Sequence, residues 1–165
     1  MDAREIIQSQ YLAALEMLKR ALVACPEALW DRVGDSIPFW QVAYHALFFT
    51  HLYLQESTEA FTYWPGHREE YRFEHAGGTA PPEPPAKSVL LNYLAFCQRQ
   101  VHEYVPTLVF EAASGFDWLP FTKFELQLYS IRHIQQHVGE LMERLGPHAS
   151  AIDWVGTYPD GAAVG

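Results

Sequence analysis

Two histidines near the C-terminal end of the chain, His133 and His137, have a spacing that suits metal binding. Residues four apart on an α-helix lie one turn above each other on the same face, so both imidazoles can reach one ion. The zinc-protease motif HExxH places a glutamate after the first histidine as general base, but this chain has Ile134 there, which argues against such a protease. A metal site here needs at least one more protein ligand. The alternative is a pair of hydrogen-bonded histidines beside the core.

The residues around this pair predict a helix over 122–145. Thr122 followed by Glu125 is a capping-box pattern, and Gly146 before Pro147 is a stop signal. Between these signals, apolar residues recur at helical spacing: Phe124, Leu128, Ile131, Ile134, Val138, Leu141, Met142 and Leu145. Both histidines fall at one edge of this apolar face, so we expect them at the rim of the core.

A candidate third ligand, His45, lies midway along a second predicted helix over 36–55. Ser36 is the expected N-cap, with Pro38 in the first turn. The helix is apolar nearly all round, which predicts a central position in its bundle. A histidine inside such a run is either a core residue with a hydrogen-bond partner or a ligand. His51, six residues on, lies about 120° around the helix from His45 and should not share its site.

The other histidines offer weaker candidates. His67 and His75 lie in a long connection, where polar residues are mostly solvated. His102 is expected on an outer helix face, and His148 follows the last helix.

The remaining pattern predicts an all-α, single-domain fold over 1–165. A first helix is expected over 2–25, where Pro26 closes it, and another begins at Ser88 and kinks or ends at Pro106. Residues 57–86 form a long crossover rich in aromatics, Gly and Pro, and 147–165 form a tail. Four helices with one long crossover between the second and third predict a four-helix bundle. A di-iron carboxylate bundle needs two ExxH motifs, and the chain has none.

Composition limits the classes of partner. Of the 165 residues, 49% are hydrophobic and 15% aromatic, enough for a substantial core. The net charge of −9 argues against nucleic acid and anionic membranes as partners. No apolar run approaches the roughly 18 residues of a membrane span, and a signal-peptide pattern is lacking, so the expected location is cytoplasmic. Cys25 and Cys97 match no metal or redox spacing, and we expect buried reduced thiols.

Two segments, FWQVAYHALFFTHLYL and FELQLYSIRHIQQHVGELMERLG, resemble the signature segments of the DinB-like superfamily, which also contains the YfiT-like proteins. The resemblance covers both segments, their spacing and the helix pattern of nearly the whole chain. It implies a four-helix bundle with a long crossover and a divalent metal, zinc or nickel, held by His45, His133 and His137. Members often carry an acidic residue where this chain has His51, and that departure leaves the three ligands intact.

The characterised branches of that superfamily are thiol-dependent transferases and isomerases, which use bacillithiol, mycothiol or glutathione. The resemblance therefore implies a divalent-metal-dependent enzyme that transfers a low-molecular-weight thiol to an electrophilic small molecule, with a homodimer as the expected assembly. Three imidazoles leave coordination positions open, as in catalytic zinc sites. One alternative is a metal-binding or oligomerising bundle without catalysis, and a metal-dependent hydrolase is favoured less.

Tyr129 and Glu125 precede His133 at successive four-residue steps, so both are candidates to orient a bound ligand. Each has a structural alternative. Tyr129 fits a core-edge aromatic equally well, and Glu125 is the capping-box partner of Thr122.

Overall fold

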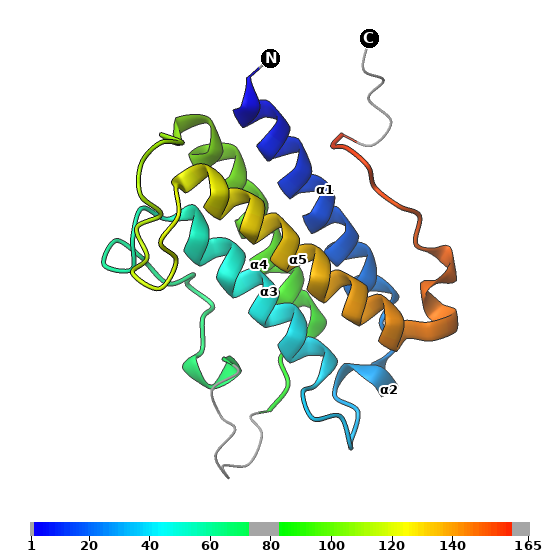
Figure 1. The fold of residues 1–165 in the computed structure, drawn as a ribbon. Coiled ribbons are helices and arrows are strands. Elements are labelled where there is room, and N and C mark those ends of the chain that lie inside the picture. Colours follow the sequence, from blue (N-terminus) through cyan, green and yellow to red (C-terminus); the bar gives the residue numbers. More distant parts are fainter. Residues whose placement is uncertain (1, 73–82, 160–165) are drawn as a thin grey trace.

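The computed structural model describes residues 2–72 and 83–159, and within these ranges the chain is all-helical. Five α-helices follow one another: α1 Ala3–Ala24, α2 Glu27–Trp30, α3 Phe39–Leu54, α4 Lys87–Tyr104 and α5 Lys123–Leu145 (Figure 1). Short 3-10 helices are η1 Glu69–Tyr71, η2 Val105–Thr107 and η3 Gly146–Ala151. The described residues contain one isolated β-bridge and no strand, so the predicted all-α class is confirmed. None of their helices is both long and apolar enough to cross a membrane.

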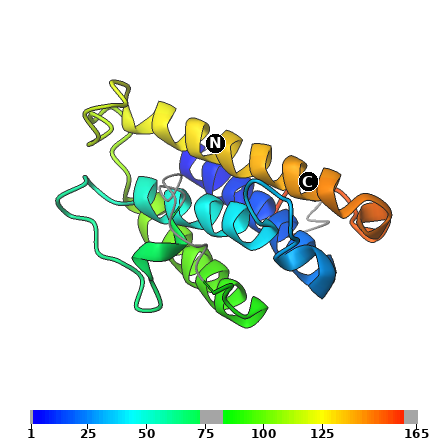
Figure 2. The same ribbon diagram turned by 90° about the horizontal axis from the view of Figure 1, so that it is seen from below.

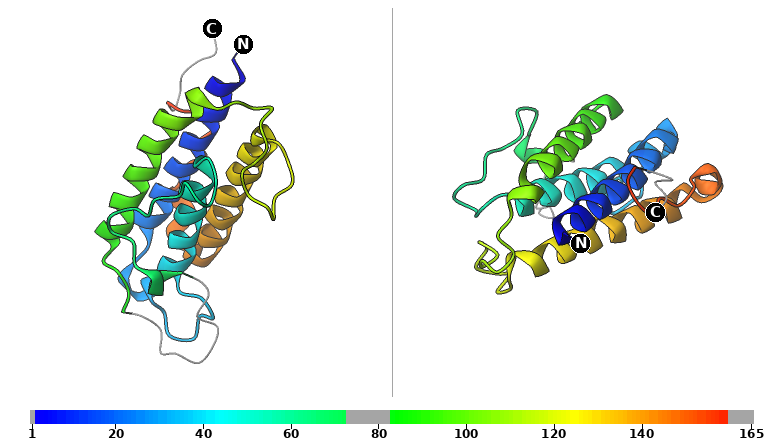
Figure 3. Two further views of the ribbon diagram at one scale, coloured as in Figure 1. Left: turned by 90° about the vertical axis from the view of Figure 1, so that its left-hand side faces the viewer. Right: turned by 90° about the horizontal axis from the view of Figure 1, so that it is seen from above.

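The long helices lie side by side, with α2 as a single turn at one end (Figures 1 and 3). Both α4 and α5 contact both α1 and α3, and seen from below α5 and α4 lie on opposite sides of α3 (Figure 2). The helices α1 and α5 run in one direction, and α3 and α4 run in the other. Because α3 and α4 are parallel, α3 ends and α4 begins at opposite ends of the bundle.

Helix α3 is buried almost completely, because it is covered on several sides. Its partners α4 and α5 pack against it from opposite sides, and aromatic residues of the long connection cover a further part of its surface. The Tyr71 ring lies 5.5 Å from the Tyr44 ring, and the Phe61 ring lies 5.6 Å from the Phe48 ring. This second layer explains why the helix is apolar nearly all round. The residues of α3 that are not fully buried are His45 and Phe49.

Several helix boundaries differ from the predicted ones. Ser36 does not cap α3, because Pro38 is the N-cap and its carbonyl accepts the N–H groups of the first turn. Proline at this place precedes the helix rather than belonging to its first turn. The one-turn α2 after Pro26 was not expected, and α4 begins at Lys87, one residue before Ser88.

Other predicted boundaries are confirmed. Thr122 caps α5, since its Oγ1 accepts the N–H of Glu125 at 3.3 Å, and Gly146 follows the last residue of the helix. Pro106 lies in η2 directly after α4, so it ends that helix as expected.

The first residue of α5 anchors the loop that precedes it. The Lys123 ammonium is buried and donates hydrogen bonds to the carbonyls of Gln55 at 2.9 Å, Glu56 at 3.0 Å and Ser114 at 2.6 Å. Gly115 has a φ of +87°, and a Cβ there would lie 1.9 Å from the Glu56 carbonyl oxygen. The loop therefore needs glycine at this position to pass so close to the end of α3.

Cys25 and Cys97 are free and buried, as expected. Burial raises the pKa of Cys25 to about 11 and that of Cys97 well above its ordinary value. Both thiols therefore stay protonated at neutral pH and are poor nucleophiles.

Candidate metal centre

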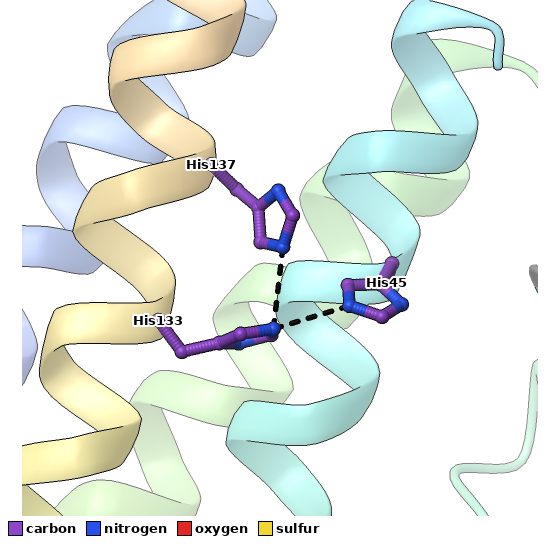
Figure 4. A group of neighbouring side chains, drawn as sticks. All are labelled: His45, His133 and His137. Atoms are coloured by element: carbon purple, nitrogen blue, oxygen red, sulfur yellow. Dashed lines mark hydrogen bonds between the residues drawn. The ribbon is translucent and has the colours of Figure 1, made fainter. Parts of the chain in front are cut away.

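Three histidines from two helices converge at the half-buried edge of α3. His45 projects from α3 toward His133 and His137, which lie one turn apart on α5 (Figure 4). The His133 Nε2 atom lies 3.1 Å from His45 Nε2 and 3.2 Å from His137 Nε2. One ring nitrogen from each residue lies within 4.8 Å of the others, and in the described part of the chain no other such group of His, Cys, Asp or Glu occurs. These residues could hold a metal ion.

The nitrogen spacing fits a metal ion better than a set of hydrogen bonds. Two nitrogens bound tetrahedrally at about 2.05 Å from zinc are about 3.3 Å apart, close to the two contacts at His133. Without a metal, the single proton or lone pair of His133 Nε2 must serve two neighbouring nitrogens at once. A shared ion removes this conflict, because all three Nε2 atoms then direct lone pairs to one point.

The electrostatics of the site favour neutral imidazoles, the form that binds metals. Burial, followed by the neighbouring charges of His133 and His137, lowers the pKa of His45 to about 3. Burial and His137 lower the pKa of His133 to about 4. At neutral pH both rings are therefore uncharged, and no proton has to be displaced from them before an ion binds.

A carboxylate on the far side of His137 orients its ring. The His137 Nδ1 atom lies 3.1 Å from Glu140 Oε2, so an Nδ1–H tautomer donates there and leaves Nε2 free for an ion. Arg144 pairs with the other Glu140 oxygen and donates to the Ile37 carbonyl at 2.7 Å. The chain of contacts thus connects the centre to the segment that precedes α3.

Aromatic rings orient His133, whose Nδ1 is buried without a hydrogen-bond partner among the described residues. The Phe49 ring lies 5.6 Å from the His133 ring and 4.7 Å from the His45 ring. Tyr129 lies nearly parallel to His133, with the ring planes 12° apart and centroids 6.4 Å apart. On its Nδ1 side, packing rather than hydrogen bonding therefore orients this ring.

The two predicted orienting residues lie in different surroundings. Tyr129 contacts the His133 ring and also packs edge-on against Tyr53, at 5.7 Å between centroids. Glu125 is exposed, and the structure does not bring it into the three-histidine group. Its backbone N–H donates to the Thr122 side chain, which is one of the two hydrogen bonds of a capping box.

The histidine predicted to lie away from the centre does so. His51 is buried on another side of α3, where its Nδ1 lies 3.2 Å from the Tyr93 hydroxyl and its ring contacts Phe61 and Phe96. This placement confirms that His51 and His45 do not share a site.

His67 is not solvated, contrary to expectation. Its side chain is 10% exposed, with Nδ1 at 2.5 Å from the Tyr44 hydroxyl and Nε2 at 3.1 Å from Glu69. Its ring also stacks on Tyr63, at 4.1 Å between centroids. The reason is that the aromatic connection folds onto α3 instead of extending into solvent.

The other histidines lie apart from the centre. His102 is exposed on an outer face of α4, as predicted, and approaches Gln8 at 3.2 Å. His148 is exposed in η3. His75 lies outside the described residues.

Sequence reasoning missed Glu140 and Phe49. Glu140 follows His137 by three residues, a spacing at which helical side chains meet, so a search for carboxylates three or four residues from each ligand finds it. Phe49 follows His45 by four residues on the same face.

Comparison with known proteins finds no relative for this chain. A scan against models of protein families finds no matching family, and searches of curated proteins and of solved structures find no match.

Proposed function

We propose that this chain is a divalent-metal-dependent enzyme of the DinB-like kind, which transfers a low-molecular-weight thiol to an electrophilic small molecule or isomerises a substrate through such an adduct. The observation that carries the proposal is the convergence of His45, His133 and His137 at a half-buried edge. The four long helices, with α3 and α4 parallel, also fit the four-helix bundle with a long crossover that the resemblance implies.

The donor set favours thiol chemistry over hydrolysis. A divalent ion held by three neutral imidazoles would supply a Lewis acid that lowers the pKa of a bound thiol. Among the described residues, no carboxylate joins the three-histidine group to serve as a general base. Glu140 contacts the far nitrogen of His137 and is paired with Arg144, so it holds a ligand in place. A thiol needs less help from a base than water does, because its unperturbed pKa is already near 8.5.

The residues around the centre have separate roles in this proposal. His137 keeps Nε2 free by donating its Nδ1 proton to Glu140. Phe49 packs against the rings of both His45 and His133, where α3 and α5 meet. Tyr129, stacked along His133, is placed to orient a bound substrate. In the transfer step the thiol has lost its proton to solvent, its sulfur forms a C–S bond with the electrophilic carbon, and the bond from that carbon to the leaving group breaks, so that the leaving group departs with its electron pair.

The test is an assay of zinc- or nickel-loaded protein with glutathione, mycothiol, bacillithiol or coenzyme A and an aryl chloride as electrophile. We expect formation of the aryl thioether and release of chloride. His137→Ala should lose both metal and activity, because two imidazoles bind too weakly, whereas Tyr129→Phe should keep the metal and change the rate. Metal-loaded protein that turns over none of these thiols would replace this proposal with a non-catalytic metal-binding bundle.

The homodimer that the resemblance implies is also a proposal. Large apolar side chains stay exposed on α5 and in the loop before it, namely Phe124 at 38%, Leu128 at 44% and Trp118 at 54%. A second copy would cover such residues. Light scattering that gives 18.9 kDa at micromolar concentrations would contradict a dimer.

A further inference from the structure

An open pocket of about 450 Å³ lies along α5, and one of the three histidines, His133, is part of its lining. Its lining includes the metal-ligand candidate His133 and the Tyr129 ring that stacks on it. The other lining residues are Arg132, Gln135 and Gln136. The pocket therefore combines one side of the proposed centre with a guanidinium and two amides.

Arg132 differs from the other arginines because it has no partner among the residues that the structure describes. Six others form ion pairs with nearby carboxylates: Arg4, Arg20, Arg32, Arg68, Arg72 and Arg144. Arg99 lies over the ring of Phe96. Arg132 is exposed and forms no hydrogen bond, ion pair or ring contact with any residue in 2–72 or 83–159. The chain has 20 acidic and 11 basic side chains, so carboxylates are plentiful. Because Arg132 pairs with none of those in the described ranges, it contributes no ion pair to the stability of the fold.

The amides beside it are unengaged as well. The side chains of Gln135 and Gln136 form no hydrogen bond within the described ranges. Arginine binds a planar carboxylate through two parallel N–H donors, and an adjacent amide can supply a further donor. The charges around the pocket also favour a carboxylate. Arg144 neutralises the nearby Glu140, so the charges of Arg132 and a divalent ion would make this side of the site positive.

We propose that the pocket binds a carboxylate of the ligand whose reactive end reaches the metal centre, with Arg132 as the specificity-determining residue. The substrate class is thus a small molecule that bears a carboxylate, carried either by the thiol or by the electrophile. The inference rests on the proposed function only for the metal at His133. A neutral ligand of equal size gains no ion pair with Arg132 and binds more weakly.

The test measures binding without turnover. Cobalt-loaded protein is titrated with mercaptoacetate, 3-mercaptopropionate and 4-mercaptobutyrate, each against its amide, and the sulfur-to-cobalt absorption band reports binding. At least one acid should bind about tenfold more tightly than its amide, since hydrogen bonds to charged groups exceed neutral ones. Because Arg132 is exposed, added salt should reduce this preference. Succinate carries carboxylates but no thiol, so it is added in competition with a thiol amide. This competition distinguishes a ligand carboxylate carried by the electrophile from one carried by the thiol.

Matched variants assign the preference. Arg132→Gln should abolish it while cobalt affinity and amide binding stay unchanged. Arg99→Gln changes the net charge equally, lies on α4 and should leave the preference intact. Equal binding of acids and amides by the unmodified protein, or a preference that survives Arg132→Gln, would overturn the proposal.

The outcome also separates this inference from the proposed function. A clear carboxylate preference in a protein that transfers no thiol supports the pocket and refutes the enzyme. If the protein binds no cobalt, the metal-free protein is titrated with succinate while NMR follows the Arg132 Nε–H signal. A shift with saturation supports the pocket, and an unchanged signal overturns it.

Discussion

Removing the Glu140 carboxylate should weaken metal binding without removing a ligand. Glu140 accepts from His137 Nδ1 at 3.1 Å and holds that ring with Nε2 directed at the centre. Loss of such an orienting carboxylate typically costs 10–100-fold in metal affinity. The Glu140 side chain is 37% exposed, so solvent screens the interaction and the lower end applies. We therefore expect Glu140→Ala to raise the zinc Kd about tenfold, equivalent to about 1.4 kcal/mol.

The assay is a zinc titration of metal-free protein in competition with a chromophoric chelator of known affinity. Glu143→Ala is the matched control, because it removes the same charge from an exposed position of the same helix. Glu140→Gln keeps an acceptor for His137 and should fall between the unmodified protein and Glu140→Ala. Unchanged zinc affinity in Glu140→Ala, or an equal loss in Glu143→Ala, would refute the role assigned to this carboxylate.

Three further predictions concern stability. Burial and the charge of His67 lower the pKa of His51 from 6.5 to about 4. As the pH falls, His51 is therefore protonated in the unfolded chain before it is protonated in the folded protein. The free energy of unfolding should then fall between pH 6.5 and 4, by at most about 3 kcal/mol from this group. His51→Gln should flatten that part of the profile in urea unfolding of metal-free protein, and superimposable profiles would contradict it. Lys123→Met leaves three carbonyls without their hydrogen-bond donor and should lower the free energy of unfolding by about 2–4 kcal/mol in urea. A decrease below about 1 kcal/mol would contradict this prediction. Gly115→Ala should lower the Tm because its Cβ meets a carbonyl, whereas Gly139→Ala, with nothing within 4 Å, should stabilise by about 0.5–1 kcal/mol; a lower Tm in both would contradict this contrast.

The helices and the three histidines could be predicted from the sequence because each leaves a local signal. The apolar spacing of α5 and its Thr122 cap define the helix and place His133 and His137 on one edge. His45 stands out because a polar residue interrupts an apolar run. These signals are local, and local patterns are what a single sequence carries most clearly.

What could not be predicted depends on contacts between distant segments. His67 looks solvated in a connection rich in glycine and proline, and only the fold brings Tyr44 to its ring. The role proposed for Arg132 rests on its having no ion-pair partner among the described residues. A sequence does not show which cationic side chains lack a carboxylate partner. Ser36 was misassigned because a serine two residues before a proline resembles a cap whether or not the helix has begun.

The buried ammonium of Lys123 has a consequence for the centre about 15 Å away. Helices α3 and α5 are antiparallel, and Lys123 contacts Gln55 as His133 contacts His45. Ten residues separate the two contacts on each chain segment, about 15 Å at 1.5 Å per residue, so both belong to one register. A slip of one residue would rotate His133 by about 100° away from His45. The hydrogen bonds of the Lys123 ammonium at one end of α3 and α5 thus help to keep His45 and His133 in register.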